Sequence, residues 1–236
     1  MKMLCFGLLP SAVAFSAAAS PKNGVWDLKG FLNDAPTLAG QLPAYLGAYV
    51  GPRAALPPTT TEAVMLTMNA VDPCPYCTGL HGELARMAGT SDDDYESPPV
   101  TYAKAFAAEA GRSGAVEAAY DALVVADGAA RARSTRALCW MLHWGKTTGN
   151  SINRARDSAL NLEPVTPFDA AVVAFYGPLF AVIGALNVLL ARLPKIPEVA
   201  SSTLGAALWV PQALHVGAMG AACLPLKLFG KATGWL

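Results

Sequence analysis

The residues of this chain with the types and spacing to do chemistry are Glu62, Cys74, Cys77 and His81, which follow the pattern E-x11-C-x2-C-x3-H. Two cysteines separated by two residues can close a disulfide and be reduced again. A nearby imidazole and carboxylate can move the protons that this thiol chemistry requires. The pattern therefore predicts a redox site made of two thiols and a Glu–His proton relay.

Helix signals place three of these residues on one element. Pro75 is a favoured first helical residue, so the sequence predicts a helix over 75–88 with Cys74 at its N-cap. Cys77 and His81 are then one turn apart on the same face. The helix dipole favours Cys74 as the thiolate. We nevertheless assign Cys77 as the nucleophile, because His81 can also supply the proton that a leaving oxygen needs.

Peroxide reduction would use every one of these groups. A thiolate that attacks a peroxide becomes a sulfenic acid, and a second thiol condenses with it to a disulfide. In this scheme Glu62, on the preceding helix, orients His81 and relays protons through it.

The motif resembles the active site of the alkylhydroperoxidase D family, within the carboxymuconolactone decarboxylase-like superfamily, and the similarity extends over about residues 25–157. The resemblance implies an all-α fold, a homo-oligomer, and reduction of organic hydroperoxides without a bound cofactor. It also implies that Cys77 is the peroxidatic cysteine, that Cys74 resolves it, and that Glu62 and His81 form the relay. Electrons would come from an external dithiol of the lipoyl or thioredoxin type.

Several features leave alternatives open. Tyr76 stands where some members of that family carry a second relay histidine. Glu62 also completes T-x-x-E with Thr59, the pattern of a capping box. The cysteines and His81 could instead bind zinc, although a fourth ligand at conventional spacing is missing. Two other functions remain: a non-catalytic, membrane-associated redox sensor or subunit, and a carboxymuconolactone decarboxylase-type enzyme, although that branch does not rely on a C-x-x-C pair.

Apolar periodicity and breaker residues favour helices throughout the chain. We predict an alkylhydroperoxidase D-like domain over 25–160, with an acidic loop at 91–99 and helices at 59–71, 75–88, 102–110, 116–124 and 131–155. Outside the motif, Cys139 and Cys223 are isolated thiols, and we interpret Cys139, His143 and His215 as core residues. The stretch WGKTTG at 144–149 is not a phosphate loop, because position 140 is tryptophan where that motif requires glycine.

The two ends of the chain differ from this domain. Residues 1–20 are predicted to be a targeting presequence for a plastid or the secretory pathway, with Lys2 before an apolar run and an A-x-A cleavage site at 12–14. Residues 168–236 are predicted to form a hydrophobic helical hairpin, since 170–191 and 203–226 carry no charge. Each run is long enough to cross a membrane, but buried or oligomer-forming helices have the same composition.

The charge balance excludes one class of partner. The chain has 17 basic and 17 acidic residues, and no basic patch is interleaved with aromatic residues. We therefore expect no nucleic acid to bind.

Overall fold

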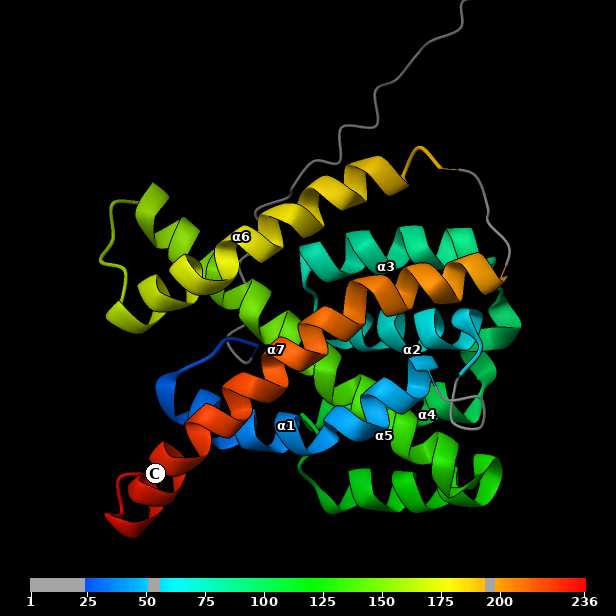
Figure 1. Ribbon diagram of the computed structural model, residues 1–236, viewed down its shortest axis with the longest axis horizontal. Coiled ribbons are helices and arrows are strands. Elements are labelled where there is room, and N and C mark those ends of the chain that lie inside the picture. The colour runs from blue at the N-terminus through cyan, green and yellow to red at the C-terminus, as the bar shows by residue number, and fades with distance from the viewer. Residues whose placement is uncertain (1–23, 51–55, 194–197) are drawn as a thin grey trace, which may run out of the picture.

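The computed structural model describes residues 24–50, 56–193 and 198–236, and every regular element in these ranges is a helix, as the sequence predicts. The predicted presequence, residues 1–20, lies outside the described residues. The elements are α1 (Leu28–Val50), α2 (Pro58–Val71), α3 (Pro75–Ala88), the short 3-10 helix η1 (Asp92–Glu96), α4 (Pro98–Ala108), α5 (Gly114–Leu160), α6 (Pro167–Leu190) and α7 (Glu198–Ala232) (Figure 1).

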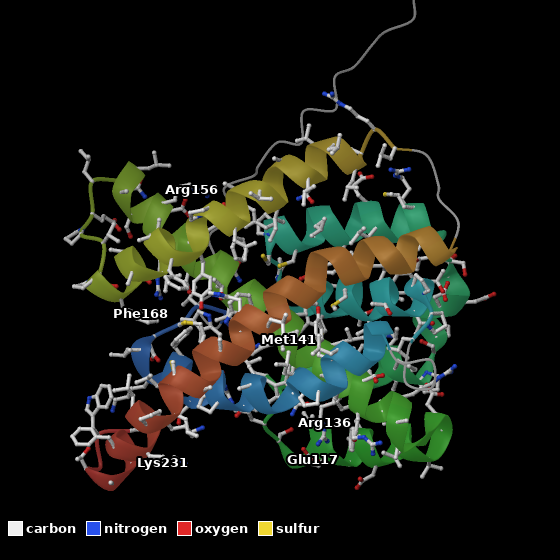
Figure 2. The ribbon with its side chains drawn as sticks, in the orientation of Figure 1. Glu117, Arg136, Met141, Arg156, Phe168 and Lys231 are labelled. Carbon is white, nitrogen blue, oxygen red and sulfur yellow. The ribbon has the colours of Figure 1, made fainter. Side chains whose placement is uncertain are left out.

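The long helix α5 forms the centre of the fold. It bends at Gly128, whose φ of 81° and ψ of 155° interrupt the helical backbone, so the two helices predicted in this region are its two parts. From Ala137 to Asn153 every residue except His143 is buried. Helices α1, α2, α4 and α6 pack around this part. Arg136, which follows the bend, donates a hydrogen bond to Glu117 near the start of α5. Figure 2 shows both residues at the edge of the molecule.

Helices α2 and α3 carry the motif. The start of α3 is as predicted, with Cys74 as N-cap, and its end has Gly89 in the left-handed conformation at φ 80°. In contrast, α2 begins at Pro58 without a side-chain cap. The capping-box alternative for Glu62 is therefore wrong, because this carboxylate bonds His81 instead.

The start of α4 and the acidic segment before it differ from the sequence prediction. The predicted loop contains the 3-10 helix η1, in which Ser91 and Asp94 form a capping box. Helix α4 then begins at Pro98, earlier than predicted, because proline is favoured in the first turn of a helix.

The two C-terminal helices are present and pack on the rest of the fold, while their pairing as a hairpin stays a prediction. Helix α6 lies against α5 and α3, whereas α7 runs beside α1 along most of its length (Figure 1). They meet where Phe175 and Tyr176 of α6 contact the ring of His215. The exposed side of α6 is apolar and includes Phe175 and Leu189.

Among the described residues, α6 is the one helix long and apolar enough to cross a membrane by length and composition, and 22% of its most apolar stretch is buried. The second predicted run, 203–226, lies partly outside the residues whose side chains are described. Either interpretation of these helices, membrane contact or association between copies of the chain, remains a proposal.

Close approach of α7 to α1 depends on a glycine. A methyl group on Gly220 would lie 2.1 Å from the carbonyl oxygen of Ala35 and 2.6 Å from Cβ of Ala39. We predict that Gly220→Ala lowers the free energy of unfolding by about 1–3 kcal/mol, because α7 must move away from α1. Urea denaturation of the full chain measures this loss.

The matched control is Gly184→Ala, also within a helix, where a methyl group meets no atom within 4 Å. This variant should be unchanged or gain up to about 1 kcal/mol from helix propensity. Equal stability of the two variants would show that the α1–α7 contact does not require glycine at position 220.

Candidate functional site

A hydrogen bond between the first and last residues of the motif joins α2 to α3. Oε2 of Glu62 lies 2.7 Å from Nδ1 of His81, and both side chains are buried. A short bond to a carboxylate is stronger than a neutral one, and it sets which ring nitrogen carries the proton. The carboxylate favours the tautomer with the proton on Nδ1, in which Nε2 of His81 is the acceptor nitrogen. The structure thus brings Glu62 and His81 together as the relay requires.

The two sulfur atoms sit at the start of α3, where α2 and α5 cover them. Both thiols are free, and Cys74 is completely buried. Behind it, Gly149 of α5 leaves room for the sulfur, since a methyl group there would lie 2.9 Å from Sγ of Cys74. The same methyl group would lie 2.8 Å from Cε1 of Phe180. Gly149 therefore allows a thiol and an aromatic ring of α6 to pack against one point of α5.

The two thiols differ in their affinity for a proton. Burial alone would raise the pKa of Cys74, but hydrogen bonding from the Cys77 thiol lowers it below its ordinary value. The backbone amide of Tyr76 and the ammonium of Lys146 act in the same direction. The pKa of Cys77 is raised well above its ordinary value, because this thiol donates the shared hydrogen bond and is buried. When the pair loses one proton, these effects favour the negative charge on Cys74 and the remaining proton on Cys77.

A buried lysine lies behind the cysteine pair. The side chain of Lys146 is fully enclosed, and its Nζ donates to the carbonyl oxygen of Met68 at 3.0 Å. Its counter-charge is Asp72, whose Oδ2 lies 3.3 Å from Nζ. One turn further along α5, Asn150 donates to the carbonyl oxygen of Pro73 at 3.2 Å. This face of α5 thus holds the end of α2 and the segment that leads into Cys74.

A small apolar pocket gives access to the site from the other side. Cys77 and His81 line it, whereas Cys74 does not. Met141 of α5 contributes to the wall, and Figure 2 shows this residue near the middle of the molecule. Phe180 and Ile183 of α6 close the pocket, which leaves a free volume of about 30 Å³, room for about one or two water-sized molecules. Cys77 is therefore the sulfur that a small molecule meets first.

The other thiols and imidazoles lie apart from this pocket. Cys139 is completely buried, and burial raises its pKa, as it does that of Cys223. The complete burial of Cys139 confirms its core interpretation, whereas His143, whose ring packs edge-on against Trp26 and Trp140, is only partly buried and has Nε2 3.7 Å from Oδ2 of Asp34. In the part of the chain that the structure describes, no three His, Cys, Asp or Glu residues are grouped as ligands of one metal ion.

The structure brings all four predicted site residues into one region and adds two that sequence reasoning missed. Lys146 is the one basic residue between Arg136 and Arg154, in a stretch whose other residues pack into the core. The lack of any other Lys, Arg, Asp or Glu between Arg136 and Arg154 is a signal that could have identified it. Phe180 carried no such signal, because it lies in a uniformly apolar run.

A comparison with family models finds one match. The model of the carboxymuconolactone decarboxylase family matches residues 36–138, which include all four motif residues. The matched segment ends inside α5, before Lys146, and contains no part of α6. No curated protein and no solved structure matches the chain.

The fit of Cys74 against α5 can be tested by adding a methyl group. Gly149→Ala should lower the free energy of unfolding of the reduced protein by about 1–3 kcal/mol, because the new Cβ overlaps Sγ of Cys74 and the ring of Phe180. In a Cys74→Ala background the same substitution should cost less, since the sulfur is gone. Urea denaturation of the four proteins gives this double-mutant cycle.

The control is Gly82→Ala on α3, where a methyl group meets nothing within 4 Å. It should not be destabilised. If Gly149→Ala lowers the free energy of unfolding equally with and without the Cys74 sulfur, the packing of Cys74 does not require glycine at position 149.

Proposed function

Because residues 36–138 belong to the carboxymuconolactone decarboxylase family, in the alkylhydroperoxidase D-like superfamily, we propose that this protein is a thiol-dependent peroxidase that reduces organic hydroperoxides. The observation that carries the proposal is the placement of the pair: Cys77 lines the pocket together with His81, while Cys74, whose pKa is lowered, lies outside the pocket wall. A peroxide that enters the pocket meets the sulfur of Cys77. Cys74 lies next to it and can attack that sulfur once it is oxidised.

In the first step, the Cys77 sulfur attacks the distal peroxide oxygen, so that an S–O bond forms and the O–O bond breaks. His81 accepts the thiol proton at Nε2 and delivers it to the departing alkoxide, which leaves as an alcohol. Glu62 stabilises the imidazolium formed in between, through its bond to Nδ1. The Cys77 sulfur is oxidised by two electrons to a sulfenic acid, and the peroxide is reduced by the same two electrons.

In the second step, the Cys74 thiolate attacks the sulfenic sulfur of Cys77. An S–S bond forms, the S–O bond breaks, and the hydroxyl group takes up a proton and leaves as water. An external dithiol then reduces the disulfide by two exchange reactions and becomes a disulfide itself. We propose a lipoyl- or thioredoxin-type dithiol for this role. The sum is one hydroperoxide and one dithiol converted to alcohol, water and a disulfide.

Peroxide consumption by the purified full-length chain, with cumene hydroperoxide and dithiothreitol, tests this function. Cys77→Ser should abolish turnover, and His81→Ala should lower it by about 10²–10⁴-fold, because proton transfer by a positioned side chain contributes about that much. Cys74→Ser should stop turnover but leave one sulfenic acid on Cys77, which a dimedone label and mass spectrometry detect. Cys139→Ala, which changes a buried thiol outside the pocket, should retain activity.

No turnover by the wild type above that of free dithiothreitol would reject the peroxidase proposal. Equal turnover by wild type and Cys77→Ser would reject the assignment of Cys77 as the peroxidatic cysteine. A sulfenic acid found on Cys74 in Cys77→Ser, with turnover stopped, would reverse the two roles.

The apolar closure of the pocket by α6 predicts how substrates are selected. The free volume of about 30 Å³ accepts the peroxide group of a substrate, and an alkyl chain must pass Phe180 or Ile183. Phe180→Ala should raise kcat/KM for cumene hydroperoxide relative to hydrogen peroxide, because the opened closure admits the bulky group. The ratio of the two values is the measurement.

Phe175→Ala is the matched control, since Phe175 lies on the exposed side of the same helix. It should leave the ratio unchanged. If Phe180→Ala also leaves the ratio unchanged, α6 does not control which peroxide reaches Cys77.

A further inference from the structure

Lys146 of α5 is a lysine whose side chain is fully buried, and the formation of the helix does not require a charge at this position. Its side chain is 1% exposed, although lysine is one of the residues least often fully buried. A buried ammonium is costly unless charges or hydrogen bonds compensate for it. One carbonyl oxygen and one carboxylate compensate here, and the carboxylate of Asp72 is itself partly exposed to water. An apolar residue could fill this volume at a lower cost in folding free energy. We therefore look for a function of the charge.

The surroundings of Lys146 point to the thiols. Met68 and Asp72 belong to the last turn and the C-cap of α2, only a few residues before Cys74. On the same face of α5, Gly149 touches the sulfur of Cys74 and Asn150 bonds the carbonyl oxygen of Pro73. Three neighbouring positions of α5 therefore contact the segment that presents Cys74.

The field of the ammonium acts on both members of the pair. Lys146 lowers the pKa of Cys74 and works against the raised pKa of Cys77, so it favours a negative charge anywhere on the two sulfurs. The hydrogen bond from Cys77 then decides which sulfur carries it. Among the residues whose side chains are described, the other titratable groups near the pair are Tyr76 and His81 of α3, Glu62 of α2, and Asp72 at the C-cap of α2.

We propose that Lys146 is a positioning residue of the cysteine pair, whose buried ammonium holds the negative charge on Cys74 so that this sulfur can close the disulfide. The inference rests on the proposed peroxidase function, but it concerns the reduced protein before any peroxide arrives. Lys146 does not touch the substrate, because the pocket wall does not include it. It acts through Cys74 from the opposite side of the pair.

The thiolate absorbance at 240 nm of the reduced full-length chain, followed against pH, tests this role. The titration that disappears in Cys74→Ser is assigned to Cys74. In Lys146→Gln, which keeps a donor for the carbonyl oxygen of Met68 but loses the charge, its midpoint should rise by about one pH unit or more. Lys146→Arg keeps the charge and should stay close to the wild type. Lys104→Met removes an exposed lysine and is the control for overall charge.

Asp72→Asn provides a second measurement that leaves Lys146 in place, in case the lysine variants do not fold. Removing the counter-charge should lower the midpoint of Cys74, since less of the ammonium's field is cancelled. An unchanged midpoint in folded Lys146→Gln would overturn the proposal, and so would an unchanged or raised midpoint in Asp72→Asn. A shift in Lys146→Gln that Lys146→Arg shares would show that packing, and not charge, is responsible.

The outcome is separable from that of the peroxidase assay, because the titration needs no peroxide. A wild type that turns over peroxide while Lys146→Gln titrates normally would reject the role of Lys146 alone. If both proposals are correct, turnover should also fall as the pH is lowered through the pKa of Cys74. In Lys146→Gln the same fall should begin at higher pH, with the shift that the absorbance measures.

Discussion

The hydrogen bond between Glu62 and His81 is the interaction on which the site depends. Two polar side chains have been taken out of water at the contact between α2 and α3, and each satisfies the other at 2.7 Å. Removing either partner would leave an uncompensated buried group, which is among the costliest changes a core can suffer. The bond therefore fixes how α3 lies on α2. The direction of Cys77, one turn before His81 on α3, follows from that placement.

Access and charge are divided between the two faces of the cysteine pair. The pocket lies on the side of Cys77 and His81, with walls that are mostly apolar. The charged groups Lys146 and Asp72 lie on the other side, against the end of α2. A thiol with a raised pKa that faces the pocket is thereby combined with a fully buried thiol whose pKa is lowered. Each cysteine has the environment that its proposed step needs, and neither environment would serve both.

Local signals in the sequence were sufficient to predict α3 and the motif, because Pro75 and Gly89 act within one turn of the helix ends that they define. The prediction of a capping box at Thr59 and Glu62 was wrong, because α2 begins at Pro58 with Pro57 as its N-cap. Lys146 could not be assigned a partner from the sequence, because Met68 is 78 residues away and their contact depends on how two helices pack. The uncharged run of α6 likewise predicted a helix but not which neighbours it would choose.

The contribution of α6 to the pocket has a consequence for where this protein can be divided. The segment that matches the family contains all the residues of the motif. Phe180 and Ile183, which also line the pocket, follow this segment by more than forty residues. A chain ending after α5 would keep Glu62, His81 and both thiols but would lose Phe180 and Ile183 from the wall of the pocket. The part of the chain that forms the pocket is therefore larger than the part that matches the family.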